Sequence, residues 1–301
     1  MQALLTSPQA PAGVTLGDVP DPRPRPDEVL VEVELFTVVA RALDHAATLP
    51  AGSVPGFDAV GVVVRPAADG SGPEVGARVA TLNMGAAWAR LRAVPTGELA
   101  VVPEGVDPGQ ASALLTPGVS ALRAIRRLGA LIGRRVLVTG AGGAVGHFAV
   151  QLGRLAGAEV IASARDLDDH ERLRVLGAAE VVTTLSEVSS PVQGVIDSVG
   201  GPLLAEAFDL LAEGGVIQQV GASSGEPTTF APYQLVGPRR AIEGFFAGDG
   251  FRLDLAYLFG LVADGRLTSL DGERAGWDDI EAIARRLRVT DAPRRMIVSA
   301  R

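Results

Sequence analysis

The sequence predicts an α/β protein in which a β-rich region precedes a doubly wound parallel sheet. Three observations support this fold class. Residues 1–105 contain strand-like apolar runs with no helical pattern between them, and from about residue 108 strand-like and helix-like patterns alternate. A glycine-rich turn at residues 140–146 joins a strand to a helix. The 301 residues, 47% of them hydrophobic, suffice for two domains with separate cores.

The β-rich region has three main strand candidates. Residues 28–35 alternate apolar and charged side chains, which is typical of a half-buried strand. Residues 58–65 and 76–80 are further apolar runs, and clusters of proline and glycine between the runs mark turns. Strands without intervening helices predict a small antiparallel sheet or barrel.

The second region begins with a helix at residues 110–128, which has one apolar face. The strands expected after it are short apolar runs at residues 135–140, 159–164, 180–184, 194–199, 215–220 and 240–246. The helices expected between them lie at residues 144–156, 168–176 and 202–212. This alternation predicts βαβ units and therefore a parallel sheet.

The C-terminal part contains two helical patterns, at residues 253–264 and 277–288, and a last apolar run at 295–299. We expect this part to fold back onto the N-terminal region. The predicted division is a first domain of residues 1–112, completed by about 248–301, and a second domain of residues 113–247.

The composition argues against several classes of protein. The charge is modestly acidic, with 35 Asp and Glu against 27 Lys and Arg and no basic stripe, so we expect no nucleic-acid partner. No cysteine is present, which excludes disulfides, thiolate nucleophiles and cysteine-ligated zinc. No apolar stretch reaches the roughly 18 residues of a membrane span, and the first residues lack the pattern of a signal peptide. These features suit a cytoplasmic protein that binds a small molecule and no membrane.

The glycine turn predicts a dinucleotide-binding site. Its four glycines leave space for a phosphate beside the start of the next helix, where free N–H groups and the helix dipole attract an anion. The spacing is G-x-x-G-x-x-G rather than the stricter G-x-G-x-x-G, but a strand precedes the turn and a helix follows it. The alternative is a tight turn between strand and helix that binds no ligand.

The end of the second strand predicts which dinucleotide binds. Sites for NAD usually carry an acidic residue there, which hydrogen-bonds the ribose 2′-hydroxyl. This chain has Ser163, Ala164 and Arg165 instead, and an arginine can pair with the 2′-phosphate of NADPH. NADPH is therefore favoured over NADH. In the alternative interpretation Arg165 is only a solvated residue at a strand end.

Several segments are similar to those of a known family. They are residues 55–61 (P-G-F-D-A-V-G), 75–79 (V-G-A-R-V), 137–146 (L-V-T-G-A-G-G-A-V-G), 149–152 (A-V-Q-L), 195–201 (V-I-D-S-V-G-G) and 211–215 (L-A-E-G-G). On these residues the chain resembles the medium-chain dehydrogenase/reductase superfamily, and within it the zinc-independent quinone oxidoreductase and enoyl reductase branch. The resemblance implies a Rossmann second domain and a GroES-like catalytic first domain. It also implies a homodimer, for which residues 239–246 are the candidate edge strand.

The resemblance bears on metal binding as well. Zinc-dependent members hold a catalytic metal with a cysteine and a His-Glu pair, and the matching positions here are Val39, Phe57 and Asp58. Valine and phenylalanine cannot ligate zinc. The three histidines are scattered along the chain, and a lone histidine is more often a surface or capping residue than a ligand. We therefore predict no metal site.

The predicted cofactor-binding residues come from the glycine turn, from strand ends and from segments that the resemblance indicates. The resemblance places Thr116 and Ser120 near the nicotinamide, and it implies that residues 245–247 contact the carboxamide through their backbone. Pro293-Arg294-Arg295 takes the place of a Gly-Lys pair near the cofactor. The full set is Thr116, Ser120, Gly140, Gly142, Gly143, Ala144, Val145, Gly146, Ser163, Arg165, Ser198, Val199, Val220, Gly221, Phe245, Phe246, Ala247 and Arg295.

The segments expected to receive the substrate depart from the family's pattern. An asparagine that commonly lines the active cleft is replaced by Val39, and a tyrosine often found shortly afterwards is missing. The polar candidates that remain are Thr37, Arg41, Asp44, His45, Asn83 and Thr116. None of them is convincing as a catalytic acid, so the catalytic residues stay unassigned, and Asp44 and His45 fit ordinary loop residues better.

The sequence therefore predicts an NADPH-dependent, zinc-independent oxidoreductase that transfers hydride to a quinone or an α,β-unsaturated carbonyl compound. One alternative is a reductase of narrow substrate range that tailors a secondary metabolite, which the short first domain and the depleted cleft favour. Another is a reductase-like protein that binds NADPH without redox catalysis, which the missing asparagine and tyrosine favour.

Overall fold

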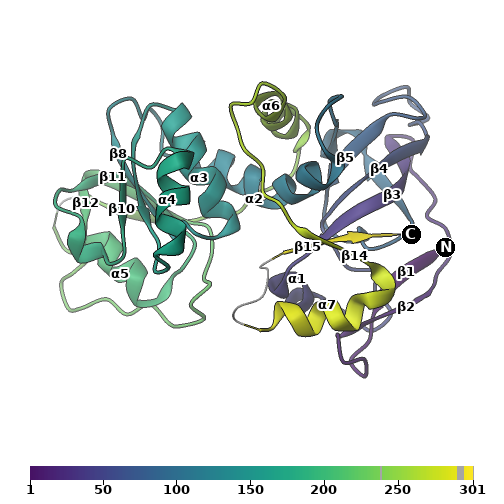
Figure 1. Ribbon diagram of the computed structural model, residues 1–301, viewed down its shortest axis with the longest axis horizontal. Helices are drawn as coiled ribbons and strands as arrows, with labels where there is room; N and C mark the ends of the chain where they lie inside the picture. Colours follow the sequence, from purple (N-terminus) through teal and green to yellow (C-terminus); the bar gives the residue numbers. More distant parts are fainter. Residues whose placement is uncertain (238, 290–294, 301) are drawn as a thin grey trace. The chain divides into compact units, whose positions relative to one another are not determined.

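The computed structural model describes residues 1–237, 239–289 and 295–300 (Figure 1). The chain forms two compact units. Unit 1 comprises Met1–Thr116 and Asp249–Arg301, and unit 2 comprises Pro117–Gly248. The boundary between the first two segments falls within helix α2 (Pro108–Arg127), which contains Pro117.

Unit 1 is built on a seven-stranded sheet in the order β14-β15-β3-β4-β5-β7, with β6 also paired to β3. All pairs are antiparallel except β14 with β15. A separate antiparallel pair joins β1 and β2. The strands are β1 (Gln2–Thr6), β2 (Val14–Asp18), β3 (Glu28–Val38), β4 (Asp58–Arg65), β5 (Arg78–Leu82), β6 (Leu91–Pro95), β7 (Leu99–Val101), β14 (Glu273–Gly276) and β15 (Met296–Ser299). The antiparallel sheet expected from the alternating patterns is confirmed.

The C-terminal part of the chain completes this sheet, as expected. Strand β15 lies antiparallel to β3, with Met296 opposite Val38. Helices α6 (Arg252–Ala263) and α7 (Ile280–Leu287) precede β15, and a 3-10 turn at Trp277–Asp279 leads into α7. Trp277 is buried in the same hydrophobic core as residues of β3. The fold-back therefore covers apolar surface that the first strands alone would expose.

Helix α1 (Ala40–Ala46) corrects one expectation, because the apolar pattern indicates no helix among the first strands. The helix follows β3 directly and buries only Leu43 and Ala46. Its N-cap residue, Val39, makes no side-chain capping hydrogen bond. With two apolar anchors and no capping residue, this short helix leaves little signal in the sequence.

Unit 2 contains a six-stranded sheet in the order β10-β9-β8-β11-β12-β13, and every pair in it is parallel. The strands are β8 (Arg135–Thr139), β9 (Glu159–Ser163), β10 (Glu180–Val182), β11 (Val192–Asp197), β12 (Leu211–Gln219) and β13 (Ala241–Gly244). The helices are α3 (Ala144–Leu155), α4 (Asp168–Leu176) and α5 (Gly201–Asp209). In chain order this is the 3-2-1-4-5-6 arrangement of a Rossmann sheet, which confirms the predicted fold class.

The order of the strands decides where a ligand can bind in unit 2. The order in which successive strands are added reverses between β8 and β11, one half of the sheet growing from β8 to β10 and the other from β11 to β13. Ligands bind outside the carboxyl ends of the strands at such a switch point. Strand β8 is apolar on both faces, with Val136, Leu137 and Val138 fully buried. Strand β13 lies at the edge of the sheet, as expected for residues 240–246.

Strand β12 begins earlier than the apolar run at 215–220 indicates. Leu211 pairs with Val192, and a register shift separates this pair from the next one, Gly194 with Val216. The irregularity hides the start of the strand, because Glu213 and Gly214 interrupt the apolar pattern.

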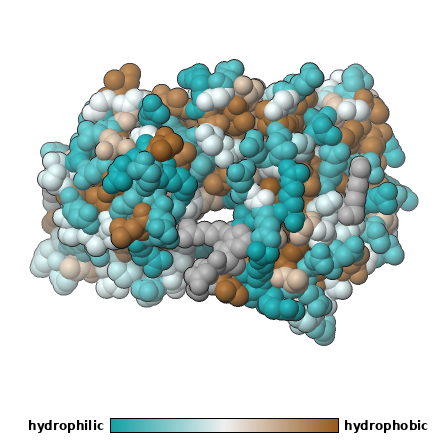
Figure 2. All heavy atoms as spheres, in the orientation of Figure 1, coloured by the Kyte–Doolittle hydropathy of each residue, from teal (hydrophilic) through white to brown (hydrophobic). Residues whose placement is uncertain are grey.

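Among the described residues no helix is long and apolar enough to cross a membrane. On the face shown in Figure 2, apolar side chains occur in separate clusters among hydrophilic ones.

Candidate functional site

The glycine turn of unit 2 has no room for side chains at two of its positions. Gly140, at the end of β8, has φ +61, and a Cβ there would lie 3.0 Å from Val199 Cγ2. A Cβ on Gly146 would lie 2.5 Å from Ala141 Cα and 2.6 Å from the Gly140 carbonyl oxygen. Both of these atoms belong to the backbone and cannot move aside. Gly146 therefore allows α3 to start directly against the end of β8.

The first turn of α3 presents N–H groups that no helical carbonyl accepts. The helix begins after Gly143, which provides no side-chain cap, and its first backbone bond runs from His147 N–H to the Gly143 carbonyl. The N–H groups of Ala144, Val145 and Gly146 precede this bond. Of the neighbouring N–H groups, that of Gly143 donates to the Gly140 carbonyl within the turn, and that of Ala141 donates to the Ser163 carbonyl at the end of β9. The arrangement suits an anion such as a phosphate.

Asp197 organises the neighbouring strand end. Its carboxylate accepts hydrogen bonds from Thr139 Oγ1 at 2.5 Å, from Gly200 N–H at 2.9 Å and from Val199 N–H at 3.4 Å. Burial raises the pKa of Asp197, and these hydrogen bonds oppose the rise. The loop that Asp197 holds includes Ser198, whose hydroxyl oxygen is buried and has no hydrogen-bond partner among the described residues. An unpaired buried hydroxyl beside a glycine turn is a candidate ligand contact.

The end of β12 joins the same group. The N–H groups of Val220 and Gly221 both donate to the Asp197 carbonyl, at 2.7 and 3.1 Å. A Cβ on Gly221 would lie 2.9 Å from the Ser198 carbonyl oxygen, so the two strand ends approach closely. The predicted cofactor residues that the structure brings together here are Gly140, Gly143, Gly146, Ser198, Val199, Val220 and Gly221.

The end of β9 carries the arginine expected to select the cofactor. Ser163 is buried, whereas Arg165 is exposed and makes no hydrogen bond or ion pair among the described residues. A second arginine was missed: Arg172 of α4 donates to the carbonyl of Gly142 in the glycine turn at 3.4 Å. Its position on the following helix gave no pattern that distinguishes it from a solvated helix residue.

The segment after β13 is fixed by helix α2. The Arg127 guanidinium lies 4.6 Å from the centre of the Phe245 ring and donates to the Phe246 carbonyl at 2.8 Å. Arg123 donates to the Ala247 carbonyl. The carbonyls of Phe246 and Ala247, which were expected to contact the carboxamide of the cofactor, therefore already accept hydrogen bonds from arginine. Each carbonyl oxygen has a second lone pair that can accept another hydrogen bond. Ser120, also on α2, is buried.

The catalytic candidates of unit 1 are not gathered into one group. Thr37 Oγ1 forms hydrogen bonds with Ser112, to its hydroxyl at 2.9 Å and to its carbonyl at 3.2 Å. Asn83 Oδ1 accepts the N–H of Met84 at 2.6 Å. Arg41 and Asp44 are exposed on α1. These contacts are structural, so none of the four residues gains a catalytic assignment from its surroundings.

Asp58 forms the main buried polar cluster of unit 1. Thr116 Oγ1 donates to Asp58 Oδ2 at 2.7 Å, although Thr116 itself is exposed. Burial raises the pKa of Asp58, and the Thr116 hydrogen bond and the charges of Arg295 and Arg92 oppose the rise. Arg295 is buried and donates to the Ala113 carbonyl at 2.8 Å. Pro293 and Arg294, which accompany it in the predicted cofactor segment, lie outside the described residues.

Arg92 stabilises the loop around the cluster. It is 1% exposed, and burial lowers its pKa to about 10. The guanidinium donates to the Thr81 hydroxyl at 2.7 Å and to the carbonyls of Phe57, Asn83 and Gly85 at 2.8–3.0 Å.

In the described part of the chain, no cluster of three or more His, Asp or Glu side chains could hold a metal ion.

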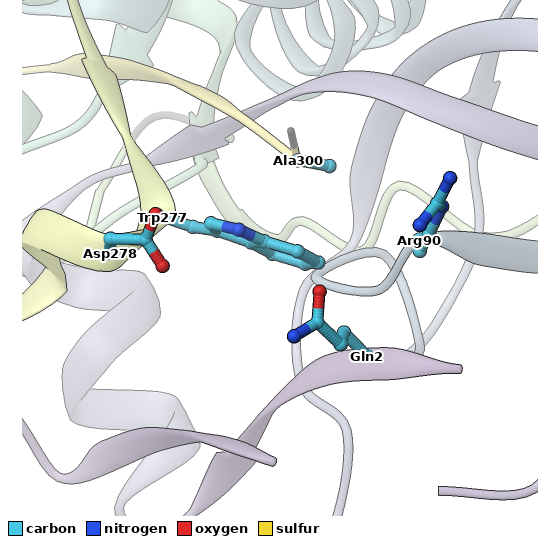
Figure 3. A pocket seen from close by; sticks show the side chains of 5 residues that line it. All are labelled: Gln2, Arg90, Trp277, Asp278 and Ala300. Carbon is cyan, nitrogen blue, oxygen red and sulfur yellow. The ribbon is translucent and has the colours of Figure 1, made fainter. Parts of the chain in front are cut away.

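A cavity of about 440 Å³ lies elsewhere in unit 1. Figure 3 shows the Trp277 ring extending into it, with the Gln2 amide and the Arg90 guanidinium across from the Asp278 carboxylate. Ala300 completes the lining. None of the predicted cofactor or catalytic residues lines this cavity.

Comparisons with known proteins agree with these features. Residues 144–264 match a family described as zinc-binding dehydrogenase. Prostaglandin reductase-3 of Bos taurus is 31% identical over 290 residues, which cover 87% of this chain and 76% of that protein. An acrylyl-CoA reductase of Ruegeria pomeroyi is 31% identical over 237 residues, which cover 70% of this chain and 71% of that protein.

Solved structures have the same fold. The quinone oxidoreductase of Coxiella burnetii matches with a TM-score of 0.84 and 24% identity, over 100% of this chain and 99% of that chain. A mycobacterial protein in complex with NADPH matches with a TM-score of 0.86 and 22% identity, over 99% and 100% of the two chains. From the fold and these relatives, the chain belongs to the medium-chain dehydrogenase/reductase superfamily, in its quinone oxidoreductase and enoyl reductase branch, and is an oxidoreductase.

Proposed function

We propose that this protein is an NADPH-dependent, zinc-independent reductase that transfers hydride to an α,β-unsaturated carbonyl compound or a quinone. The observation that carries the proposal is the glycine turn of unit 2. Gly146 lets α3 begin against β8, so the N–H groups of Ala144, Val145 and Gly146 are available to a phosphate. Bound NADPH would supply the hydride from its nicotinamide ring.

The residues present fit such a cofactor. A side chain at Gly146 would collide with the backbone of the turn, and the buried Ser198 hydroxyl next to the turn has no partner among the residues that the structure describes. Arg165 and Arg172 supply positive charge at the end of β9 and beside the turn, where the family has its adenosine site. No acidic residue ends β9, which supports NADPH rather than NADH. The mycobacterial relative in fold binds NADPH, in agreement with this choice.

Independence from zinc is supported by the donor set. The chain has no cysteine, and valine and phenylalanine occupy two of the positions that ligate zinc in zinc-dependent members. A metal-free site must stabilise the developing oxyanion with hydrogen-bond donors instead. The single hydroxyl hydrogen of Thr116 is donated to Asp58 Oδ2, so the exposed Thr116 hydroxyl is not such a donor.

The acceptor class is proposed from the relatives, which are named as reductases of a prostaglandin, of acrylyl-CoA and of quinones. The test is the loss of the near-ultraviolet absorbance of NADPH with an enone, an enoyl thioester and a benzoquinone, each in the presence of a chelator. Turnover of at least one acceptor is expected. Tight binding of NADPH without turnover of any acceptor would instead favour the non-redox alternative, and inhibition by the chelator would remove the zinc-independent mechanism.

We also propose that two copies of the chain pair through β13. This strand is at the edge of its sheet, and Tyr233, Val236 and Phe246 nearby in sequence are each more than 70% exposed. An unprotected edge strand with exposed apolar side chains favours association. Light scattering should give twice the mass of the chain, and a Phe246→Asp variant should shift it toward the monomer. A wild-type monomer at all concentrations would contradict the pairing.

A further inference from the structure

Arg172 of α4 is held against the glycine turn by three contacts. Its Nη2 donates to the Gly142 carbonyl at 3.4 Å and to Asp169 Oδ1 at 2.5 Å. Its Nη1 lies 3.2 Å from Nδ1 of His147, a buried residue in the first turn of α3. Because the partners come from α4, from the turn and from α3, the guanidinium has a fixed place beside the glycine turn and the first turn of α3.

The guanidinium retains donors for a ligand. An arginine has five N–H groups, and among the described residues these contacts use one on Nη1 and two on Nη2. The Nε–H and one Nη1–H remain. The side chain is 37% exposed, so a ligand at the turn can reach it. Asp169 offsets part of the charge, but the long contact to Gly142 can be exchanged for one to an anionic oxygen.

Arg165 provides a useful contrast on the same edge of the sheet. It is exposed at the end of β9 and makes no hydrogen bond or ion pair among the described residues. Binding a phosphate through Arg165 therefore requires a flexible side chain to be ordered, which costs free energy. Arg172 is already ordered, so less of its interaction energy is lost on binding.

We propose that Arg172 is a phosphate-binding residue of the dinucleotide site. This inference rests on the function proposed above. The phosphate is either the ribose 2′-phosphate, in which case Arg172 selects NADPH together with Arg165, or the pyrophosphate that NADPH and NADH share. Both sources have the same chemistry, a dianionic or bridging phosphate next to a helix N-terminus and an arginine.

Calorimetric titration of the full chain with NADPH, NADH and adenosine 2′,5′-bisphosphate separates the sources. Arg172→Gln should weaken NADPH binding about tenfold, the loss typical of one charged hydrogen bond. A 2′-phosphate contact weakens NADPH and the bisphosphate but leaves NADH unchanged. A pyrophosphate contact weakens NADPH and NADH equally. The result for NADH is decisive, because the 5′-phosphate of the bisphosphate corresponds to one phosphate of the pyrophosphate.

Arg174→Gln is the matched control. Arg174 lies on the same helix, its side chain is 53% exposed, and it forms a long ion pair of 3.8 Å with Glu171. The Arg174→Gln variant should therefore bind all three ligands as the wild type does. Arg172→Lys keeps the charge and should recover part of the affinity. Equal losses in the Lys and Gln variants would indicate a purely structural role and overturn the proposal.

The outcome for the wild type separates this inference from the proposed function. If the wild type binds NADPH and Arg172→Gln binds it equally well, the phosphate-binding role of Arg172 is wrong and the reductase proposal stands. If the wild type binds none of the three ligands, the cofactor site itself is wrong, and the inference fails with it.

Discussion

The predicted site residues of the two units differ in how many of their polar groups are left for a ligand. In unit 2, Asp197 holds the loop around Ser198, yet the buried Ser198 hydroxyl has no partner in the described part of the chain, and the first N–H groups of α3 have none within the helix. In unit 1, Thr37 and Asn83 make internal hydrogen bonds instead. Native proteins pair nearly all buried polar groups, so an unpaired one is a candidate ligand contact. Unit 1 also has two such atoms among the described residues, Trp88 Nε1 and Arg295 Nε, but they do not belong to its catalytic candidates. The contrast supports the proposed cofactor site of unit 2 more than the catalytic candidates of unit 1.

The largest effect is expected from Arg92→Met. Removing this donor takes a hydrogen bond from three carbonyls, of which only that of Phe57 has a second one, from Asn83 N–H, among the hydrogen bonds described. It also takes a cation from beside buried Asp58, so unit 1 should lose about 3–5 kcal/mol of stability. Tryptophan fluorescence during urea unfolding measures unit 1 alone, because Trp88 and Trp277 both belong to it. NADPH affinity of the folded variant should stay unchanged. A large loss of affinity with unit 1 still folded would break the contrast between the units.

Gly146→Ala tests the tight start of α3. The new Cβ would clash with the backbone of Ala141, so we expect a loss of about 1–3 kcal/mol and much weaker NADPH binding. Gly260→Ala is the control, because Gly260 is also helical and has nothing within 4 Å of a Cβ. It should raise stability by roughly 0.5–1 kcal/mol. Thermal unfolding followed by circular dichroism compares the two, and equal behaviour would contradict the packing argument.

Two serine substitutions sharpen the comparison further. Ser198→Ala removes an unpaired hydroxyl, so stability should change by less than about 0.5 kcal/mol while NADPH affinity falls several-fold. Ser112→Ala removes a hydroxyl bonded to Thr37, so stability should fall by about 1 kcal/mol with NADPH affinity unchanged. Urea unfolding and NADPH titration are measured on both variants. The reverse pattern would mean that unpaired groups do not mark the ligand site.

The smallest expected effect is the pH dependence due to Asp58, because nearby donors oppose the effect of burial. Burial raises the pKa of Asp58 above its ordinary value of 3.8. A carboxyl with a raised pKa in the folded state contributes most stability below its unfolded pKa, and this contribution is lost as pH rises through the folded pKa. Wild type should therefore lose stability relative to Asp58→Asn as pH rises above 3.8. A relative gain with rising pH would show that Arg92 and Arg295 outweigh the burial.

The elements of unit 2 could be predicted closely because local patterns determine them. Apolar strands, a glycine turn and amphipathic helices each leave a signal, and α4 was expected at its observed bounds. Helix α1 could not be predicted, since only Leu43 and Ala46 anchor it. The start of β12 was hidden by its irregular pairing with β11.

Contacts between distant segments explain what was missed at the candidate site. Asp197 stands at the end of an apolar strand and before two glycines, a signal that could have marked it as a buried organiser of the loop. The contact of Arg172 with Gly142 joins residues 30 positions apart and leaves no periodic trace. The arginines of α2 that hold residues 245–247 are more distant still, and their helix pattern indicated only a solvated face.

The most direct test of the central claim is the fate of deuterium placed at C4 of the NADPH nicotinamide. The enzyme would be incubated with the two C4-deuterated epimers in turn, an α,β-unsaturated carbonyl acceptor and a chelator, and the product examined by mass spectrometry. Metal-free hydride transfer predicts that one epimer, and not the other, delivers its deuterium to carbon in the product. Consumption of NADPH with no deuterium in the product from either epimer would contradict it.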